Sequence, residues 1–132
     1  MPHIIYAAGD GQHIVWAHKD MTGVQTALES RQHALTYHGC HDEESTYVAV
    51  HVGLFWCIGT FRIKNGEYAR IVTTPKRAPS LCTQSKSSSR IIAEKTHFIS
   101  ELIKKRSIKI SYVCDTDEVN PAEVELAKFS AQ

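Results

Sequence analysis

The stretch TFRIKNGEYARIV, residues 60–72, carries the strongest local structural signal in this chain. Asn65-Gly66 is a dipeptide that tolerates two successive positive φ angles, as a type I′ hairpin turn demands. The residues on either side include several β-branched and aromatic types, which favour strands. We therefore expect 60–63 and 68–72 to pair as an antiparallel hairpin that turns at Asn65-Gly66.

Upstream of this hairpin the sequence predicts another hairpin, a helix and a third strand. Residues 3–8 and 12–18 form the opening hairpin, because a turn dipeptide lies between two apolar runs. Asp20 is expected to cap a helix over 21–37, where apolar residues recur at helical spacing. The β-branched run that follows extends the central hairpin, so that residues 46–73 become a three-stranded antiparallel meander.

Downstream, the pattern predicts a helix, a strand and a second helix. Ser88 or Ser89 caps a helix that continues to about residue 106, with an apolar stripe on one side. Residues 108–114 alternate between apolar and polar side chains, which indicates a strand. Pro121 then opens a short C-terminal helix.

The expected order of elements is therefore β-β-α-β-β-β-α-β-α, in one domain over residues 1–132. A chain of 132 residues can form one hydrophobic core but not two ordinary domains. Residues 1–45 supply the first hairpin and helix, and residues 46–132 supply the meander, helix, strand and last helix. This order indicates a mixed sheet covered by helices, of α+β or α/β class.

The composition is that of an average globular protein, with 42% hydrophobic and 22% charged residues, and it excludes disordered, collagen-like and fibrous chains. No signal peptide opens the chain, and no apolar run reaches the roughly 20 residues of a membrane-spanning helix. We therefore expect a soluble, intracellular (cytoplasmic) protein with no membrane partner. The cysteines form no Cys-x-x-Cys pair and are expected to be reduced and mostly buried: Cys40, Cys57, Cys82 and Cys114.

A net charge of +1 conceals an uneven distribution of charge. Residues 75–87 are predicted to be a long exposed loop, and this loop and the helix after it are rich in Lys and Arg. Basic segments of this kind bind phosphates through Coulomb attraction and counterion release. The candidates for contact with RNA or DNA are Lys76, Arg77, Lys86, Arg90, Lys104, Lys105 and Arg106.

From about residue 46 to 125 the pattern resembles the ribonuclease H-like domains of retroelements. Three pieces carry the resemblance. The first is FWCIGTF, residues 55–61, which continues through Asn65-Gly66 to Ile71. The second is SSSRIIAE, residues 87–94, which is similar to the serine-rich entry and Ala-Glu of a helix that carries a catalytic carboxylate in that family. The third is ISYVCD, residues 110–115, a strand that ends in an acid and is followed by a helix.

The resemblance implies a nucleic-acid-associated domain whose carboxylates hold Mg²⁺ or Mn²⁺ for phosphodiester cleavage. Glu94 and Asp115 would be two of the metal ligands. The family's first-strand Asp would fall near His51 or Val52, where this sequence has no acid. The implied domain is therefore either a nuclease or a degenerate version that binds without cleaving.

Two other functions remain open on the sequence. His13 and His51, if their strands are neighbours, form a pair for general acid–base cleavage of RNA without metal, because histidine titrates near neutral pH. Alternatively, the chain is a non-enzymatic interaction module whose strand edge or 75–87 loop docks on a protein partner or on a second copy of itself. Small α+β folds carry all of these functions, so the fold class does not choose among them.

Overall fold

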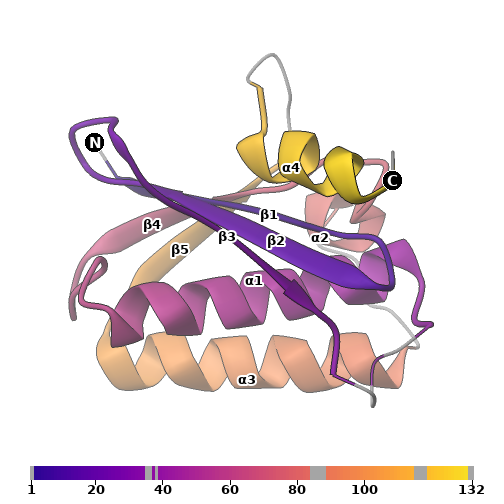
Figure 1. Ribbon diagram of the computed structural model, residues 1–132. Helices are drawn as coiled ribbons and strands as arrows, with labels where there is room; N and C mark the ends of the chain where they lie inside the picture. Colours follow the sequence, from indigo (N-terminus) through magenta and orange to yellow (C-terminus); the bar gives the residue numbers. More distant parts are fainter. Residues whose placement is uncertain (1, 35–36, 38, 84–88, 115–118, 131–132) are drawn as a thin grey trace.

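The computed structural model describes residues 2–34, 37, 39–83, 89–114 and 119–130. They form a mixed five-stranded sheet with helices on both faces (Figure 1), which confirms the expected class. In chain order the elements are β1 (His3–Gly9), β2 (His13–Lys19), β3 (Gln25–Gln32), α1 (Asp42–Gly59), β4 (Tyr68–Val72), α2 (Pro79–Thr83), α3 (Arg90–Arg106), β5 (Lys109–Val113) and α4 (Pro121–Ser130).

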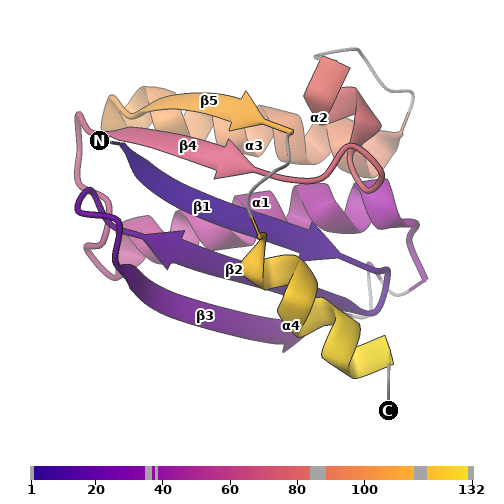
Figure 2. The same ribbon diagram turned by 90° about the horizontal axis from the view of Figure 1, so that it is seen from above.

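The strands lie in the order β3-β2-β1-β4-β5. β2 pairs antiparallel with both β1 and β3, whereas β1, β4 and β5 run parallel to one another. The three parallel strands therefore end at the same edge of the sheet, and α4 begins near that edge (Figure 2).

The helices divide the core into two layers. α1 and α3 cover one face of the sheet, and α4 crosses the other (Figures 1 and 2). Alternate residues of β1 point to opposite faces, as the pleat of a strand requires: Ile5 packs in the α1 layer and Tyr6 in the α4 layer. Both faces of β1 are therefore buried.

The helix predicted over 21–37 is wrong, because β3 occupies residues 25–32. The Asp20 carboxylate accepts hydrogen bonds from the backbone N–H groups of Thr22 and Val24, at 2.9 and 3.1 Å. Gly23 adopts a φ of +87°, which suits glycine, and the chain turns back on β2. The helical spacing was misleading because β3 is an edge strand whose apolar side chains stay largely exposed; Leu28 is 39% exposed.

The meander predicted over 46–73 is also wrong, because α1 spans residues 42–59. His41 and Glu44 form a capping box at its start. The helix lies between the sheet and α3 and buries residues on most of its circumference, so it lacks the polar stripe of a surface helix. A continuous apolar run does not distinguish a buried helix from a strand, and here tertiary burial overrides the β-branched composition.

Only the second half of the predicted hairpin over 60–72 is correct. Residues 60–63 are not a strand, whereas the turn at Asn65-Gly66 leads into β4, with Gly66 at a φ of +85°. The observed order is therefore β-β-β-α-β-α-α-β-α. The opening hairpin, the third helix (α3), the last strand and the C-terminal helix are confirmed, and Ser89 is the N-cap of α3.

The expectation of four reduced cysteines is wrong for two of them. Cys82 of α2 and Cys114, just after β5, form a disulfide with their Cα atoms 5.3 Å apart; Cys40 and Cys57 are free. The 32-residue separation in sequence gave no sign of this contact, and α2 itself lies in the stretch predicted as a loop.

Among the described residues, no helix is long and apolar enough to span a membrane.

Candidate functional site

Four element ends meet around the side chain of Arg77, and we call this place the Arg77 corner. Its Nε donates to both carboxylate oxygens of Glu123 in α4, each at 2.8 Å. Its Nη1 donates to Asp42 Oδ2 in α1 at 2.9 Å and to the backbone oxygen of Gly9, the last residue of β1, at 3.1 Å. The Thr74 hydroxyl, just after β4, donates to Glu123 at 3.1 Å.

Local structure explains why these groups converge. Gly9 permits the N-terminal turn of α1 to approach β1, because a Cβ at this position would lie 2.6 Å from the carbonyl carbon of Ser45. Asn120 caps α4 by accepting hydrogen bonds from the N–H groups of Ala122 and Glu123, at 2.9 and 3.3 Å. The cap fixes the first turn of α4, which directs the Glu123 carboxylate toward Arg77.

The corner combines one cation with two carboxylates. The side chains of Arg77 and Glu123 are each 23% exposed and that of Asp42 is 54% exposed, so the Arg77–Glu123 pair is the more protected from solvent. A guanidinium stays protonated in proteins and offers five donors but no lone pair. Within the described part of the chain, no group of three or more His, Cys, Asp or Glu side chains could hold a metal ion.

The Arg77 corner lies at the end of the first strand, and the resemblance implies a metal-binding Asp on that strand. The resemblance placed the first-strand Asp near His51 and Val52, but both residues lie in α1. The first strand is β1, with the sequence HIIYAAG, and it contains no acid. Asp10 follows it, but its carboxylate accepts hydrogen bonds from the N–H groups of Gln12 and His13 in the turn to β2.

Of the two carboxylates predicted as metal ligands, the structure describes Glu94 but not Asp115. Glu94 lies on α3, is partly exposed, and accepts a hydrogen bond from the Tyr37 hydroxyl at 3.2 Å; Lys95 Nζ lies 4.0 Å away. Asp115 lies outside the described residues. A metal site shared by Glu94 and Asp115 therefore stays a prediction.

The structure does not bring the two candidate histidines together. His13 of β2 stacks on Phe129 of α4, with ring centroids 4.3 Å apart. His51 belongs to α1 and stacks on Phe98 of α3 at 5.6 Å, so the two imidazoles lie on opposite faces of the sheet. Burial, and then the nearby Lys95 ammonium, lower the pKa of His51.

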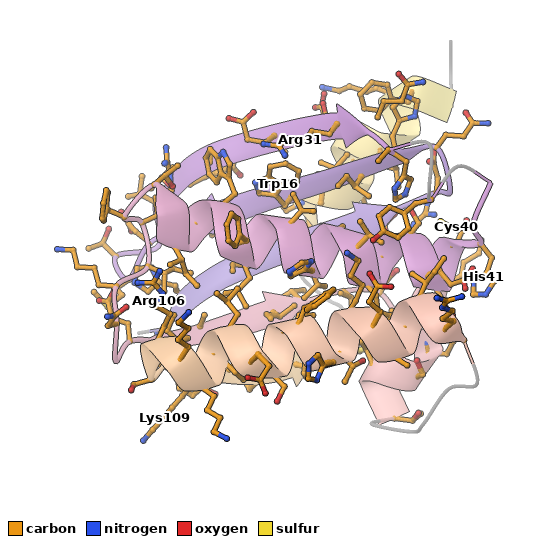
Figure 3. All side chains as sticks on the ribbon, turned by 90° about the horizontal axis from the view of Figure 1, so that it is seen from below. Trp16, Arg31, Cys40, His41, Arg106 and Lys109 are labelled. Atoms are coloured by element: carbon orange, nitrogen blue, oxygen red, sulfur yellow. A yellow bond between two sulfur atoms is a disulfide. The ribbon has the colours of Figure 1, made fainter. Side chains whose placement is uncertain are left out.

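The predicted phosphate-binding residues do not form one surface. Arg77 is engaged in the corner, and Lys86 lies outside the described residues. Lys76 and Arg90 are exposed at the corner's end of the molecule, whereas residues 104–106 lie at the far end of α3. Because α3 has 17 residues, its ends are about 25 Å apart. Figure 3 shows this separation, with His41 at one end and Arg106 at the other.

Sequence reasoning missed a hydrogen-bond chain at the other end of β1, which is buried at its centre and reaches the surface at both ends. Five side chains are hydrogen-bonded in series. The four bonds are Arg62 Nε to Thr26 Oγ1 (3.2 Å), Thr26 Oγ1 to His18 Nδ1 (2.5 Å), His18 Nε2 to His3 Nδ1 (3.0 Å) and His3 Nε2 to Glu67 Oε1 (3.1 Å). His3 and His18 are 3% and 1% exposed. The position of His3 and His18 at the ends of apolar runs was the signal available, and it indicates strands but not pairing of the two rings.

The two ends of this chain have fixed roles. The Arg62 guanidinium can only donate, and it donates to Thr26 Oγ1; the Glu67 carboxylate accepts from His3 Nε2. Burial, followed by repulsion from His3 and Arg62, lowers the pKa of His18 to about 4.

No protein-family model and no curated protein matches this sequence. Solved structures do match it. Ribonuclease H1 from the archaeon Halobacterium salinarum is 12% identical with a TM-score of 0.66 over 86% of each chain. LC11 ribonuclease H1, isolated from compost, is 12% identical with a TM-score of 0.67 over 99% of each chain. A foamy-virus protease–reverse transcriptase, solved with an RNA/DNA hybrid, is 15% identical with a TM-score of 0.54 over 89% of this chain and 17% of that one. The chain therefore has a ribonuclease H-like fold.

Proposed function

We propose that this chain is a nucleic-acid-binding domain of ribonuclease H-like fold that does not cleave its ligand. The observation that carries the proposal is the Arg77 guanidinium, which is bonded to Asp42, Glu123 and the end of β1. Two of the structural neighbours were solved with an RNA/DNA hybrid, which is the ligand class that we assign to this chain.

The chemistry of the corner supports the loss of cleavage. Metal-dependent phosphodiester cleavage needs carboxylates arranged around divalent cations that activate water and stabilise the leaving oxygen. Arg77 supplies the positive charge that two carboxylates require, but it has no vacant coordination position and does not acidify a water molecule. With no acid on β1, the corner suits an internal ion pair better than a metal centre.

The first test measures binding and cleavage of the same labelled RNA/DNA hybrid. We expect binding that weakens steeply as salt rises, because each phosphate contact releases counterions. We expect no cleavage product with Mg²⁺ or Mn²⁺. Lys76→Glu combined with Arg90→Glu should weaken binding of all sequences alike, whereas Lys128→Glu, on the exposed side of α4, serves as the matched control.

Two results would overturn the proposal in different ways. Metal-dependent cleavage that disappears in Glu94→Gln would show an active nuclease and would support the predicted Glu94–Asp115 site. No binding to RNA, DNA or hybrid at low salt would favour the protein-interaction module instead.

A further inference from the structure

A dense group of cations lies at the end of the molecule remote from the Arg77 corner. We call it the α3 pole and define it by Lys64, Lys104, Lys105, Arg106 and Lys109, all of which are exposed. α1 has 18 residues and runs from the corner toward this pole, so the two places are about 27 Å apart. Figure 3 shows Arg106 and Lys109 at this end.

The charge of the α3 pole is poorly neutralised. In the described ranges no ion pair joins any of the five cations to a carboxylate. Glu67, an acid in the same loop, accepts hydrogen bonds from His3 and from the backbone N–H of Lys64, at 3.1 and 2.6 Å. The bond from the Lys64 N–H, together with His3 and the Lys64 charge, lowers the pKa of Glu67. The excess of positive charge at the pole attracts an anionic partner.

A pocket opens within the pole between the end of α1 and the end of α3. Its volume is about 370 Å³, at the lower end of the range for small-ligand sites. Its lining combines an aromatic ring, two aliphatic side chains, an amide and two cations: Phe61, Ile58, Ile63, Asn65, Lys64 and Arg106. A lining of apolar residues together with two cations suits a ligand that has both a flat apolar part and a negative charge.

A phenylalanine at position 61 is energetically unfavourable in the isolated chain, because its ring is exposed to solvent and its backbone has a positive φ. Its side chain is 80% exposed, and its φ of +62° is rare for a residue with a Cβ. The turn nevertheless holds it in place, because its N–H donates to Ile58 O at 3.1 Å and the N–H of Arg62 donates to Cys57 O at 2.9 Å. The turn thus presents an exposed aromatic residue beside Lys64 and Arg106, which line the same pocket.

We infer that the α3 pole binds single-stranded nucleic acid, with an unpaired base stacked on Phe61 and the adjacent phosphates on Lys64 and Arg106. The inference rests on the proposed nucleic-acid function and adds to it a single-stranded ligand, bound at a surface remote from Lys76 and Arg90. Stacking on an exposed aromatic needs a base that is free on one face, which a single strand offers along its length and a duplex offers only at its ends.

The test uses fluorescence anisotropy with a labelled oligo(U) and an oligo(dT) of about 12 nucleotides, a length within the range of single-strand sites. Phe61→Asn removes the ring, while asparagine tolerates the left-handed backbone. We expect it to weaken binding roughly 5- to 150-fold without changing the salt dependence. Phe55→Ala is the matched control, because Phe55 is 63% exposed on α1 and does not line the pocket.

A second variant separates charge from stacking. Lys64→Gln combined with Arg106→Gln should lower the slope of log affinity against log salt by about 1.4, since each lost phosphate contact on a single strand contributes about 0.7. Both side chains are exposed, so this variant should fold even if Phe61→Asn does not. A thermal melt of every variant identifies loss of fold.

Three results would overturn the inference. The first is wild-type affinity in folded Phe61→Asn, or an equal loss in Phe55→Ala. The second is equal, Phe61-dependent binding of a blunt duplex. The third is binding to anionic phosphatidylserine vesicles but not to either oligonucleotide. If the pole variants bind oligo(U) and oligo(dT) like the wild type, while Lys76→Glu with Arg90→Glu loses binding to the hybrid, the proposed function survives and only the α3 pole inference fails.

Discussion

Replacement of Arg77 by glutamine is expected to lower the free energy of unfolding by roughly 2 kcal/mol, because it leaves Asp42 and Glu123 without a counter-ion and the carbonyl of Gly9 without its donor. The value is below that of a fully buried pair because Arg77 is partly exposed. Urea unfolding measures the loss. Lys76→Gln, next to it in sequence and exposed, should stay within about 0.5 kcal/mol of wild type.

Arg77→Gln should also make the melting temperature depend on Mn²⁺. In the wild type we expect Mn²⁺ to leave the melting temperature unchanged, because the guanidinium already occupies the carboxylates. In Arg77→Gln we expect Mn²⁺ to raise it, since a cation that binds only the folded state stabilises that state. A rise in the wild type that disappears in Glu94→Gln would place metal at the predicted Glu94–Asp115 site instead and contradict this account.

Mild acid is expected to destabilise the fold by up to about 3 kcal/mol between pH 6.5 and pH 4. The pKa of His18 falls from 6.5 to about 4 on folding. Below pH 6.5 the unfolded chain therefore binds a proton that the folded chain does not. The free energy of unfolding keeps its full value above pH 6.5. Below that pH it falls by about 1.4 kcal/mol per pH unit, until His18 becomes protonated in the folded state as well.

Two measurements test the assignment to His18. The urea midpoint from pH 8 to pH 4 gives the total loss, to which His51 contributes in the same direction because its pKa is also lowered. NMR titration of the His18 ring in the folded protein should show protonation only near pH 4. A His18 ring that titrates near 6.5 in the folded protein would contradict the prediction.

Elements with local signals could be predicted from the sequence, and those set by tertiary burial could not. A serine cap and an amphipathic stripe identify α3, and alternation identifies β5. α1 has no polar stripe because the sheet and α3 both cover it, and β3 has little buried surface because it is an edge strand. The resemblance indicated the correct fold even though its first strand was placed in what is α1.

The Arg77 corner could not be predicted, because its contacts join residues that are remote in sequence. Arg77 lies 35 residues from Asp42 and 46 from Glu123. No motif marks such a pair, and in the sequence Arg77 is indistinguishable from its exposed neighbour Lys76. The charge pattern identified a basic segment. In the folded chain, one of its cations lies in an internal ion pair, and the other described ones lie on two surfaces at opposite ends of α3.

The Cys82–Cys114 disulfide closes a covalent ring that contains the whole of α3 and β5. A single break of the backbone anywhere in this ring leaves both pieces in one molecule of nearly unchanged mass, and they separate only after reduction. Seven lysines and arginines lie inside the ring, so limited trypsin treatment offers many places for such a break. The connection between the α3 pole and the rest of the chain thus has two covalent routes, one through peptide bonds and one through sulfur.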